Sequence, residues 1–166
     1  MKITKELLKE KGACAAGYRD FLKEYPVDKY PDGVEYQELL DCCAEKNFSY
    51  GLWLLDVFGR TDDVRKIDGD LIVEKGIIFA GRLEVKGCIE AGRGIKAGYG
   101  IKAGCGIEAG SGIEAGYGIE AGCEYGIYAG LRCRITNKTF RKIIAKERPE
   151  NIMCGEFEEK KDDAVR

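Results

Sequence analysis

The feature that most constrains this chain is a run of six-residue repeats that fills residues 71–130. Written in sixes, this segment reads LIVEKG, IIFAGR, LEVKGC, IEAGRG, IKAGYG, IKAGCG, IEAGSG, IEAGYG, IEAGCEYG and IYAG. The first position of every six is Leu or Ile, and the third is Val, Phe or Ala. Because alternate residues of a strand point to the same side, both positions face one interior. Recurring glycines allow bends between short strands, so these hexapeptide repeats predict a β-solenoid, or β-helix.

The length of one coil follows from the residues that would stack on neighbouring coils. A spacing of 18 residues places Tyr99 over Tyr117 and Cys105 over Cys123, whereas a spacing of 12 pairs unlike residues. Ladders of like residues favour the longer spacing, which corresponds to three sixes per coil. The sequence therefore predicts a triangular β-solenoid with 18-residue coils and about 3 coils.

The second position of each six points to solvent and is charged in most repeats. At a spacing of 18, several opposite charges become neighbours. These pairs are Glu84 with Lys102, Lys102 with Glu120, and Lys96 with Glu114. Glu90 over Glu108 is an exception, because it stacks two like charges.

The segments on either side of the repeats follow other patterns. Residues 1–62 have apolar residues at helical spacing and predict three or four short helices, with Thr4 and Ser49 as possible caps. Residues 131–166 predict two or three strands and a charged tail. We therefore expect an α+β chain with a helical head at 1–62, a β-solenoid at 63–130 and a C-terminal β-strand cap at 131–166.

The composition excludes several kinds of chemistry. The 166 residues include no histidine, which rules out Ser-His-Asp, Cys-His and zinc-histidine sites. The 8 cysteines form no CxxC motif and are expected to be reduced thiols, so we expect neither a metal nor another cofactor. Lys and Arg number 27 against 29 Asp and Glu, a balance that does not favour direct nucleic-acid binding.

Membrane association is not expected either. No apolar run approaches the roughly 20 residues that a helix needs to cross a bilayer. The chain opens with MKITKELLKEKG, which contains no apolar signal region. We therefore expect a cytoplasmic location.

Three parts of the sequence together resemble a known group of proteins. They are CAAGYRDF at 14–21, SYGLWLLDVFGRTD at 49–62, and the IDGDLIV segment with the GIxAG sixes that follow it. Their combination resembles a group of largely uncharacterised proteins encoded by bacteriophages and prophages. The resemblance implies phage origin and expression in the cytoplasm of a bacterial host. Small proteins of such genomes often block host defences by binding, as anti-CRISPR proteins do, so the resemblance implies a class of partner but assigns no residues.

The sixes are also similar to those of hexapeptide acyltransferases and bactofilin-like β-helices. The catalytic histidine of the acyltransferases is absent here, which argues against their activity. Bactofilin-like filaments usually lack a helical head and charged ladders, but self-assembly of this kind stays open.

Several functions therefore remain to be weighed. We expect first a non-enzymatic binding protein that inhibits a bacterial defence system, such as a CRISPR complex, by stoichiometric docking. The alternatives are a structural, self-assembling β-helix protein and a sponge for a small nucleotide signal. An enzyme is not expected, because no nucleophile lies beside a base. We also expect a homodimer, because a thin prism leaves apolar surface to cover.

The candidate partner-binding residues belong to the exposed ladders and to the basic segment after the repeats. They are Arg93, Lys96, Tyr99, Lys102, Glu114, Tyr117, Arg132, Arg134, Arg141 and Lys142. Two simpler interpretations stay open. Tyr99 and Tyr117 can stack merely to stabilise the prism. The basic segment can be a solvated strand face that the acidic tail partly neutralises.

Overall fold

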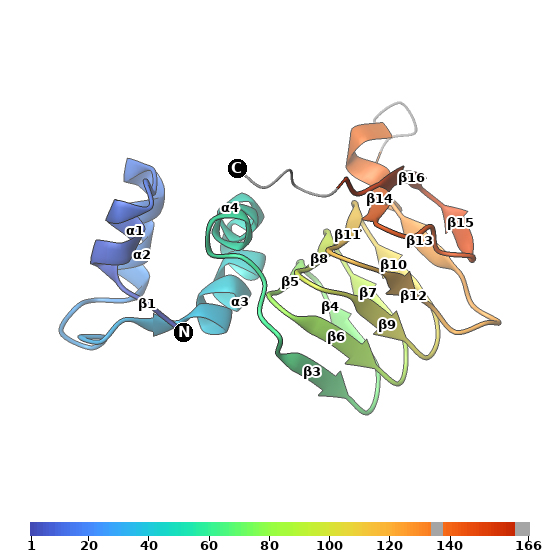
Figure 1. Ribbon diagram of the computed structural model, residues 1–166, viewed down its shortest axis with the longest axis horizontal. Helices are drawn as coiled ribbons and strands as arrows, with labels where there is room; N and C mark the ends of the chain where they lie inside the picture. Colours follow the sequence, from blue (N-terminus) through green and yellow to red (C-terminus); the bar gives the residue numbers. More distant parts are fainter. Residues whose placement is uncertain (134–137, 162–166) are drawn as a thin grey trace. The chain divides into compact units, whose positions relative to one another are not determined.

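The computed structural model describes residues 1–133 and 138–161 (Figure 1). The chain forms two compact units, Met1–Phe58 and Gly59–Arg166. The first unit is mostly helical, and the second consists mainly of short strands. Within the described residues, no helix is long and apolar enough to cross a membrane.

Four helices and a two-stranded antiparallel sheet make up the first unit. The elements are β1 (Lys2–Ile3), α1 (Lys5–Glu10), α2 (Ala15–Glu24), β2 (Val34–Glu35), α3 (Tyr36–Lys46) and α4 (Phe48–Phe58). Thr4 caps α1 as expected, since its hydroxyl accepts a hydrogen bond from the Leu7 amide at 3.2 Å. The expected cap at Ser49 is wrong, because α4 already begins at Phe48. The Ser49 hydroxyl instead donates to the side-chain oxygen of Asn47 at 2.7 Å.

The helices of this unit bury one apolar face each. In α3 the buried residues recur every three or four positions, as an amphipathic helix requires. They are Tyr36, Leu39, Leu40, Cys43 and Ala44. The Tyr36 hydroxyl donates to the backbone oxygen of Leu54 at 3.2 Å and so ties α3 to α4.

The described part of the second unit contains fourteen strands in three parallel sheets, the faces of a solenoid (Figure 1). Face 1 has the strand order β12-β9-β6-β3, face 2 has β15-β13-β10-β7-β4, and face 3 has β16-β14-β11-β8-β5. Every third strand returns to the same face over most of the unit, so the three-sided coil is confirmed. The strands are β3 (Val64–Ile67), β4 (Leu71–Val73), β5 (Ile77–Phe79), β6 (Arg82–Val85), β7 (Ile89–Ala91), β8 (Ile95–Ala97), β9 (Ile101–Ala103), β10 (Ile107–Ala109), β11 (Ile113–Ala115), β12 (Ile119–Glu120), β13 (Ile127–Ala129), β14 (Lys142–Ala145), β15 (Ile152–Cys154) and β16 (Glu156–Glu159). A 3₁₀ turn, η1 (Lys138–Arg141), precedes β14.

The coil length of 18 residues is confirmed in the repeat region. On face 2, for example, Ile107 lies opposite Ile89. The next coil is longer, because Ile107 lies opposite Ile127 on its other side, 20 residues away. The two additional residues are Glu124 and Tyr125, which bulge at the corner between faces 1 and 2.

This bulge moves the ladder by one residue and overturns one expected stack. Glu120 still pairs in register with Lys102. Beyond it, the amide of Gly122, not that of Cys123, donates to the backbone oxygen of Cys105 at 3.0 Å. The prediction that Cys123 lies in register over Cys105 is therefore wrong.

The solenoid has about five turns, and the expected number of about three is wrong. Faces 2 and 3 each contain five stacked strands. One further strand, β3, comes before the first repeat, and the strands β14 to β16 continue faces 2 and 3 after the last repeat. β14 keeps Ile143 and Ala145 fully buried but has lost the glycines of the repeat. The segment expected as a cap thus supplies further strands of the same sheets.

The first and third positions of the repeats fill the interior as predicted. Ile89, Ile107 and Ala109 have no exposed surface. Successive coils are so close at the corners that a side chain would not fit there. A Cβ on Gly98, for example, would lie 2.0 Å from the backbone oxygen of Ala80.

Candidate functional site

The most distinctive surface of the solenoid results from a missing strand. Face 1 has four strands, whereas the other two faces have five. In a regular coil, the nine residues 98–106 connect β8 on face 3 to β10 on face 2 and include the face 1 strand β9. Only the six residues 146–151 connect β14 to β15. This shorter connection crosses face 1 without forming a strand, so β12 remains at the edge of its sheet.

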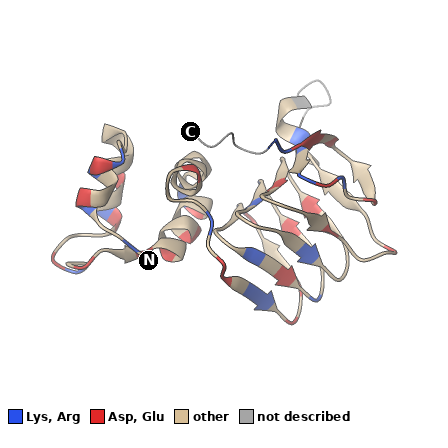
Figure 2. Cartoon of the chain, in the orientation of Figure 1, with Lys and Arg blue, Asp and Glu red and all other residues tan. Residues whose placement is uncertain are grey.

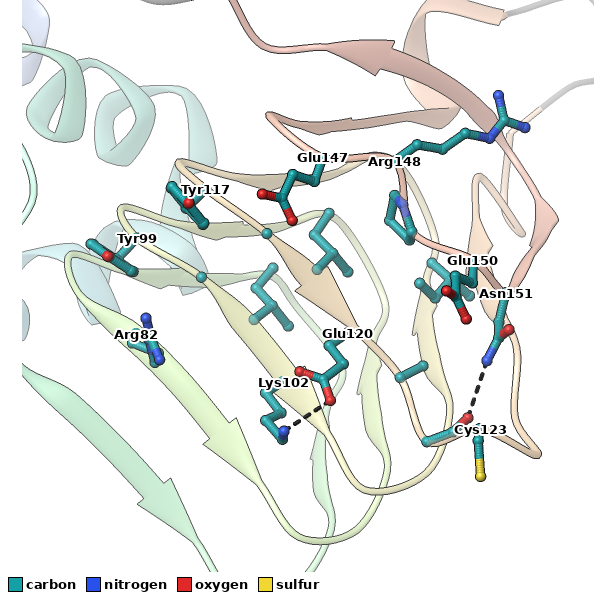
Figure 3. Close-up of a pocket in the computed structure, with 18 residues that line it drawn as sticks. Arg82, Tyr99, Lys102, Tyr117, Glu120, Cys123, Glu147, Arg148, Glu150 and Asn151 are labelled. Carbon is teal, nitrogen blue, oxygen red and sulfur yellow. Dashed lines mark hydrogen bonds and ion pairs between the residues drawn. The ribbon is translucent and has the colours of Figure 1, made fainter.

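Hydrogen bonds hold both ends of the connection in place. The Lys146 amide donates to the backbone oxygen of Tyr117 at 2.8 Å, and the backbone oxygen of Asn151 accepts from Ile127 at 2.8 Å. The side-chain amide of Asn151 also donates to the backbone oxygen of Gly122 at 3.3 Å. Between the connection and face 1 lies a groove of about 770 Å³ (Figure 3). Its position is therefore fixed by the fold.

One wall of the groove is a stack of aromatic and cationic side chains at the corner between faces 3 and 1 (Figure 3). The rings of Tyr99 and Tyr117 are parallel to within 16° with their centres 5.7 Å apart, which confirms the predicted stack. The guanidinium of Arg82 lies 4.7 Å from the centre of the Tyr99 ring, and that of Arg60 lies 5.3 Å from it. Tyr117 is 44% exposed and forms the open end of this aromatic column.

Charged groups of both signs surround the column. On the floor of the groove, the Lys102 ammonium and the Glu120 carboxylate are 2.8 Å apart, as the ladder predicts. The connection contributes the exposed carboxylates of Glu147 and Glu150. Arg148 points out of the groove in Figure 3, and its guanidinium lies 5.6 Å from the centre of the Phe157 ring. The groove is therefore aromatic and of mixed charge, with no concentration of cations.

Lys96 and Glu114 belong to a different cluster on face 3. The Lys96 ammonium lies 3.3 Å from the Glu114 carboxylate, and Lys160 donates to the same carboxylate at 2.9 Å. Burial raises the pKa of Glu114, but the two lysines outweigh burial and hold the pKa below its usual value. Lys160 follows β16, so this cluster attaches the end of the described chain to the solenoid. These two candidates have a structural role here and do not line the groove.

Two cations of the basic segment that follows the repeats are paired within the chain. The Arg141 guanidinium donates to the Glu156 carboxylate at 3.2 Å, and Lys142 pairs with Glu158. Both acidic partners belong to β16, which lies beside β14. These contacts support the interpretation that the acidic tail neutralises part of the basic segment.

The remaining candidates lie elsewhere. Arg93 and Arg132 lie at the corner between faces 2 and 3, so they do not meet the tyrosines. Arg134 lies outside the described residues. The structure thus brings together Tyr99, Tyr117 and Lys102 from the set expected from sequence.

Arg82 and the residues of the 146–151 connection line the groove but are not among the candidates expected from the sequence. The spacing of 18 residues offers a signal for Arg82, because it places Arg82 beneath Gly100 and next to Tyr99. The connection offers no comparable signal, since its path depends on the unpredicted strands β14 and β15.

Comparisons with protein-family models, with curated proteins and with solved structures gave no match. Within residues 1–133 and 138–161, no group of three or more Cys, Asp or Glu residues is placed to hold a metal ion. The fold belongs to the class of parallel β-solenoids preceded by helices. The candidate site is a groove with an aromatic wall.

Proposed function

We propose that this chain is a non-enzymatic binding protein. It binds its partner at the groove of face 1, in a fixed stoichiometry, and thereby inhibits the partner. The observation that carries the proposal is the aromatic column at the rim of the groove. Tyr and Arg are the residue types in which binding energy concentrates at protein interfaces. Tyr117 presents an exposed ring, while Arg82 and Tyr99 support it from one side.

The scaffold suits docking because its recognition residues are already ordered. Tyr117 and Tyr99 are joined along the ladder by a backbone hydrogen bond of 2.6 Å, and their Cα atoms belong to successive coils of a packed prism. Side chains that are held in place before binding lose little conformational freedom when the partner arrives. A solenoid of stacked strands thus offers a preformed surface.

The charges of the groove favour a protein partner over a phosphate-bearing ligand. Lys102 is paired with Glu120, and Arg82 lies against the Tyr99 ring. Glu147 and Glu150 add negative charge, which repels phosphate groups. A nucleotide sponge would use the basic cluster Arg132, Arg134, Arg141 and Lys142. Two of these, Arg141 and Lys142, are engaged by Glu156 and Glu158. The groove therefore supports neither a nucleotide sponge nor direct nucleic-acid binding.

The partner that we propose is a bacterial defence complex, such as a CRISPR complex, in the cytoplasm of a phage-infected host. This part of the proposal rests on the resemblance to phage and prophage proteins. The proposal of docking without turnover rests on the lack of histidine in the sequence. A pull-down from the bacterial host tests the partner: recovery of a defence complex supports it, and recovery of this chain alone favours self-assembly instead.

The groove itself is tested with Tyr117→Ala, measured by calorimetric titration against the recovered complex and by thermal unfolding. Tyr125→Ala is the matched control, because Tyr125 is 48% exposed at another corner of the solenoid. We expect Tyr117→Ala to weaken binding by about 2 kcal/mol or more, as at interface hot spots, with Tyr125→Ala close to wild type. Unchanged binding by Tyr117→Ala would show that the column is only scaffold. Inhibition at strongly substoichiometric amounts would instead indicate turnover.

A further inference from the structure

The outward-facing side chains of the three faces differ in how their charges are balanced. On face 1, Lys102 pairs with Glu120 at 2.8 Å, and Lys66 lies 3.8 Å from Glu84. Face 3 shows the same arrangement in the Lys96, Glu114 and Lys160 cluster and in the pair of Lys142 with Glu158. Figure 2 shows basic and acidic segments on neighbouring strands of the solenoid. Two of the faces thus balance their own charges.

Face 2 does not. Glu90 in β7 lies directly opposite Glu108 in β10, and both are exposed. Among residues 1–133 and 138–161, neither carboxylate forms an ion pair. Like charges directly opposite each other destabilise a sheet, so this acidic stripe, Glu90 and Glu108, costs the isolated chain stability.

Apolar side chains flank the acidic stripe on the same face. Ile72, opposite Glu90 in β4, is 64% exposed, and Met153 in β15 is 67% exposed. Met153 and Tyr128 lie together over Gly126, since a Cβ on this glycine would lie 2.5 Å from Met153 Cγ and 2.7 Å from Tyr128 Cε2. Exposed apolar groups next to unbalanced charges mark a surface that a partner covers.

A row of cations runs along the corner that follows face 2. This basic corner consists of Lys75, Arg93 and Arg132, all exposed and without an ion-pair partner in the described part of the chain. The Arg93 amide donates to the backbone oxygen of Lys75 at 2.9 Å, so the two residues stand on successive coils. The exposed Glu74 precedes Lys75 at the same corner, so the acidic stripe and the basic corner are two parallel rows of opposite net charge.

Arg132 brings its charge down to the level of the stripe. Its backbone amide donates to the oxygen of Gly110 at 3.0 Å. Its side chain extends back over earlier coils, because Cβ atoms on Gly110 and Gly92 would lie 3.1 Å from Arg132 Cδ and from Arg132 Nη1, respectively. Gly92 and Gly110 follow the strands that contain Glu90 and Glu108. The Arg132 side chain therefore passes the level of Glu108, and its guanidinium lies near the level of Glu90, which is also the level of Arg93.

We propose that face 2 binds a second copy of this chain in a two-fold dimer whose axis runs parallel to the axis of the solenoid. Such a rotation leaves the position of every residue along the solenoid axis unchanged. It can place each row of one copy against the row of opposite charge of the other copy. The acidic stripe of each copy then meets the basic corner of the other, with Glu90 opposite Arg93 of the second copy. A two-fold axis along the strands would instead place each row against itself.

A second copy accounts for the surface better than another partner does. A basic protein would neutralise the stripe but would face repulsion from the basic corner, and an acidic partner or nucleic acid would meet the reverse conflict. Two copies related by a two-fold axis neutralise both rows at once, because a two-fold interface pairs each patch with its complement on the other copy. The dimer is independent of the groove on face 1.

The experiment uses two charge-reversed variants of the full chain. The first is Glu90→Arg with Glu108→Arg, and the second is Arg93→Glu with Arg132→Glu. Sedimentation velocity at tens of micromolar and low salt should show a dimer for the wild type and monomers for each variant, with the dissociation constant raised about tenfold or more by the like charges. An equimolar mixture of the two variants should dimerise again, because each now complements the other.

The control variant exchanges a balanced pair on face 1, Lys66→Glu with Glu84→Lys, and should dimerise like the wild type. Thermal unfolding of every variant confirms that the monomers are folded. A monomeric wild type, a dimer that survives either reversal, or a mixture that stays monomeric overturns the proposal. A wild-type dimer that resists high salt also overturns it, because exposed ion pairs are screened.

Discussion

The helical unit and the solenoid bury their apolar side chains in different ways. In the helical unit, Ile3 is buried from a two-residue strand and Leu40 from a helix, so each position has its own surroundings. In the solenoid, the same two positions of the coil are used again and again, and Ile107 stacks between Ile89 and Ile127. A change at one solenoid position is therefore felt by the coils on both sides, as expected when stability comes from contacts between neighbouring repeats.

The two units can be followed separately in solution. The chain contains one tryptophan, Trp53, which lies in α4 of the helical unit. Its fluorescence reports on the helical unit. Circular dichroism reports on the helices and the strands together, so a circular dichroism transition that Trp53 fluorescence does not share belongs to the solenoid. Predictions about either unit can therefore be tested in the intact chain.

The largest effect is expected from Ile107→Ala, which removes a fully buried side chain between two coils. It should lower the free energy of unfolding by about 2 to 5 kcal/mol, because the neighbouring isoleucines cannot collapse into the cavity without disturbing their own coils. Denaturant unfolding followed by circular dichroism measures the loss. Glu108→Ala on the outer surface is the control and should change stability by less than about 1 kcal/mol. Equal losses would mean that the interior has been assigned to the wrong face.

The same experiment tests whether the helical unit and the solenoid unfold independently. If the units are independent, Ile107→Ala shifts the circular dichroism transition and leaves the Trp53 fluorescence transition in place. If both transitions shift together, the chain unfolds as one cooperative unit.

Glycine substitutions should have a smaller effect, for different reasons in the two units. A Cβ on Gly98 would lie 2.0 Å from the backbone oxygen of Ala80, so Gly98→Ala should cost about 1 to 3 kcal/mol by forcing two coils apart. Gly12 follows α1 with φ of +79° and has no atom within 4 Å of a Cβ, so only its left-handed backbone resists a side chain. Asparagine tolerates that backbone conformation.

The measurement therefore compares alanine with asparagine at each position. Gly12→Asn should be more stable than Gly12→Ala, as measured by Trp53 fluorescence. Gly98→Asn should be no more stable than Gly98→Ala, as measured by circular dichroism. Rescue of the solenoid by asparagine would contradict the close approach of the coils.

How far the sequence predicts this fold depends on how strictly each segment repeats. The stacking of Tyr99 on Tyr117 and the pairing of Lys102 with Glu120 follow directly from the 18-residue spacing. The number of coils did not follow, because β14 keeps only the alternation of Ile143 and Ala145 and has no glycine signature. A four-residue strand of this kind carries too little information to be recognised without the coil beneath it.

The candidate site was predicted only in part, for a related reason. Tyr99, Tyr117 and Lys102 belong to the regular ladders and were found. The groove exists because six residues, rather than nine, cross face 1 between β14 and β15. Glu147 and Glu150 reach the groove only through that shorter path. The loss of three residues predicts a missing strand on face 1 only when the strands on both sides of the connection, β14 and β15, are known.

The smallest expected effect is the response to pH, which should have opposite directions in the two units. In the solenoid, Lys96 and Lys160 hold the pKa of Glu114 below its ordinary value of 4.5. Above that value the carboxylate is ionised in both the folded and the unfolded chain, and its contribution to stability is complete. As the pH falls below 4.5, the unfolded chain takes up the proton first, so the solenoid loses this contribution. Glu114→Gln should reduce the acid sensitivity of the circular dichroism transition.

In the helical unit, burial raises the pKa of the Cys43 thiol from 9.0 to about 12, with a smaller effect from Cys42. Below pH 9 the thiol is neutral in both states and costs nothing. As the pH rises from 9 toward 12, the unfolded chain loses the proton first, so the helical unit becomes less stable. The buried Tyr36 hydroxyl, whose burial also raises its pKa, acts in the same direction. The free energy of unfolding measured by Trp53 fluorescence should therefore fall in alkali. Cys43→Ala should reduce this dependence on pH. Equal sensitivity to alkali in the wild type and the variant would rule out the thiol as its cause.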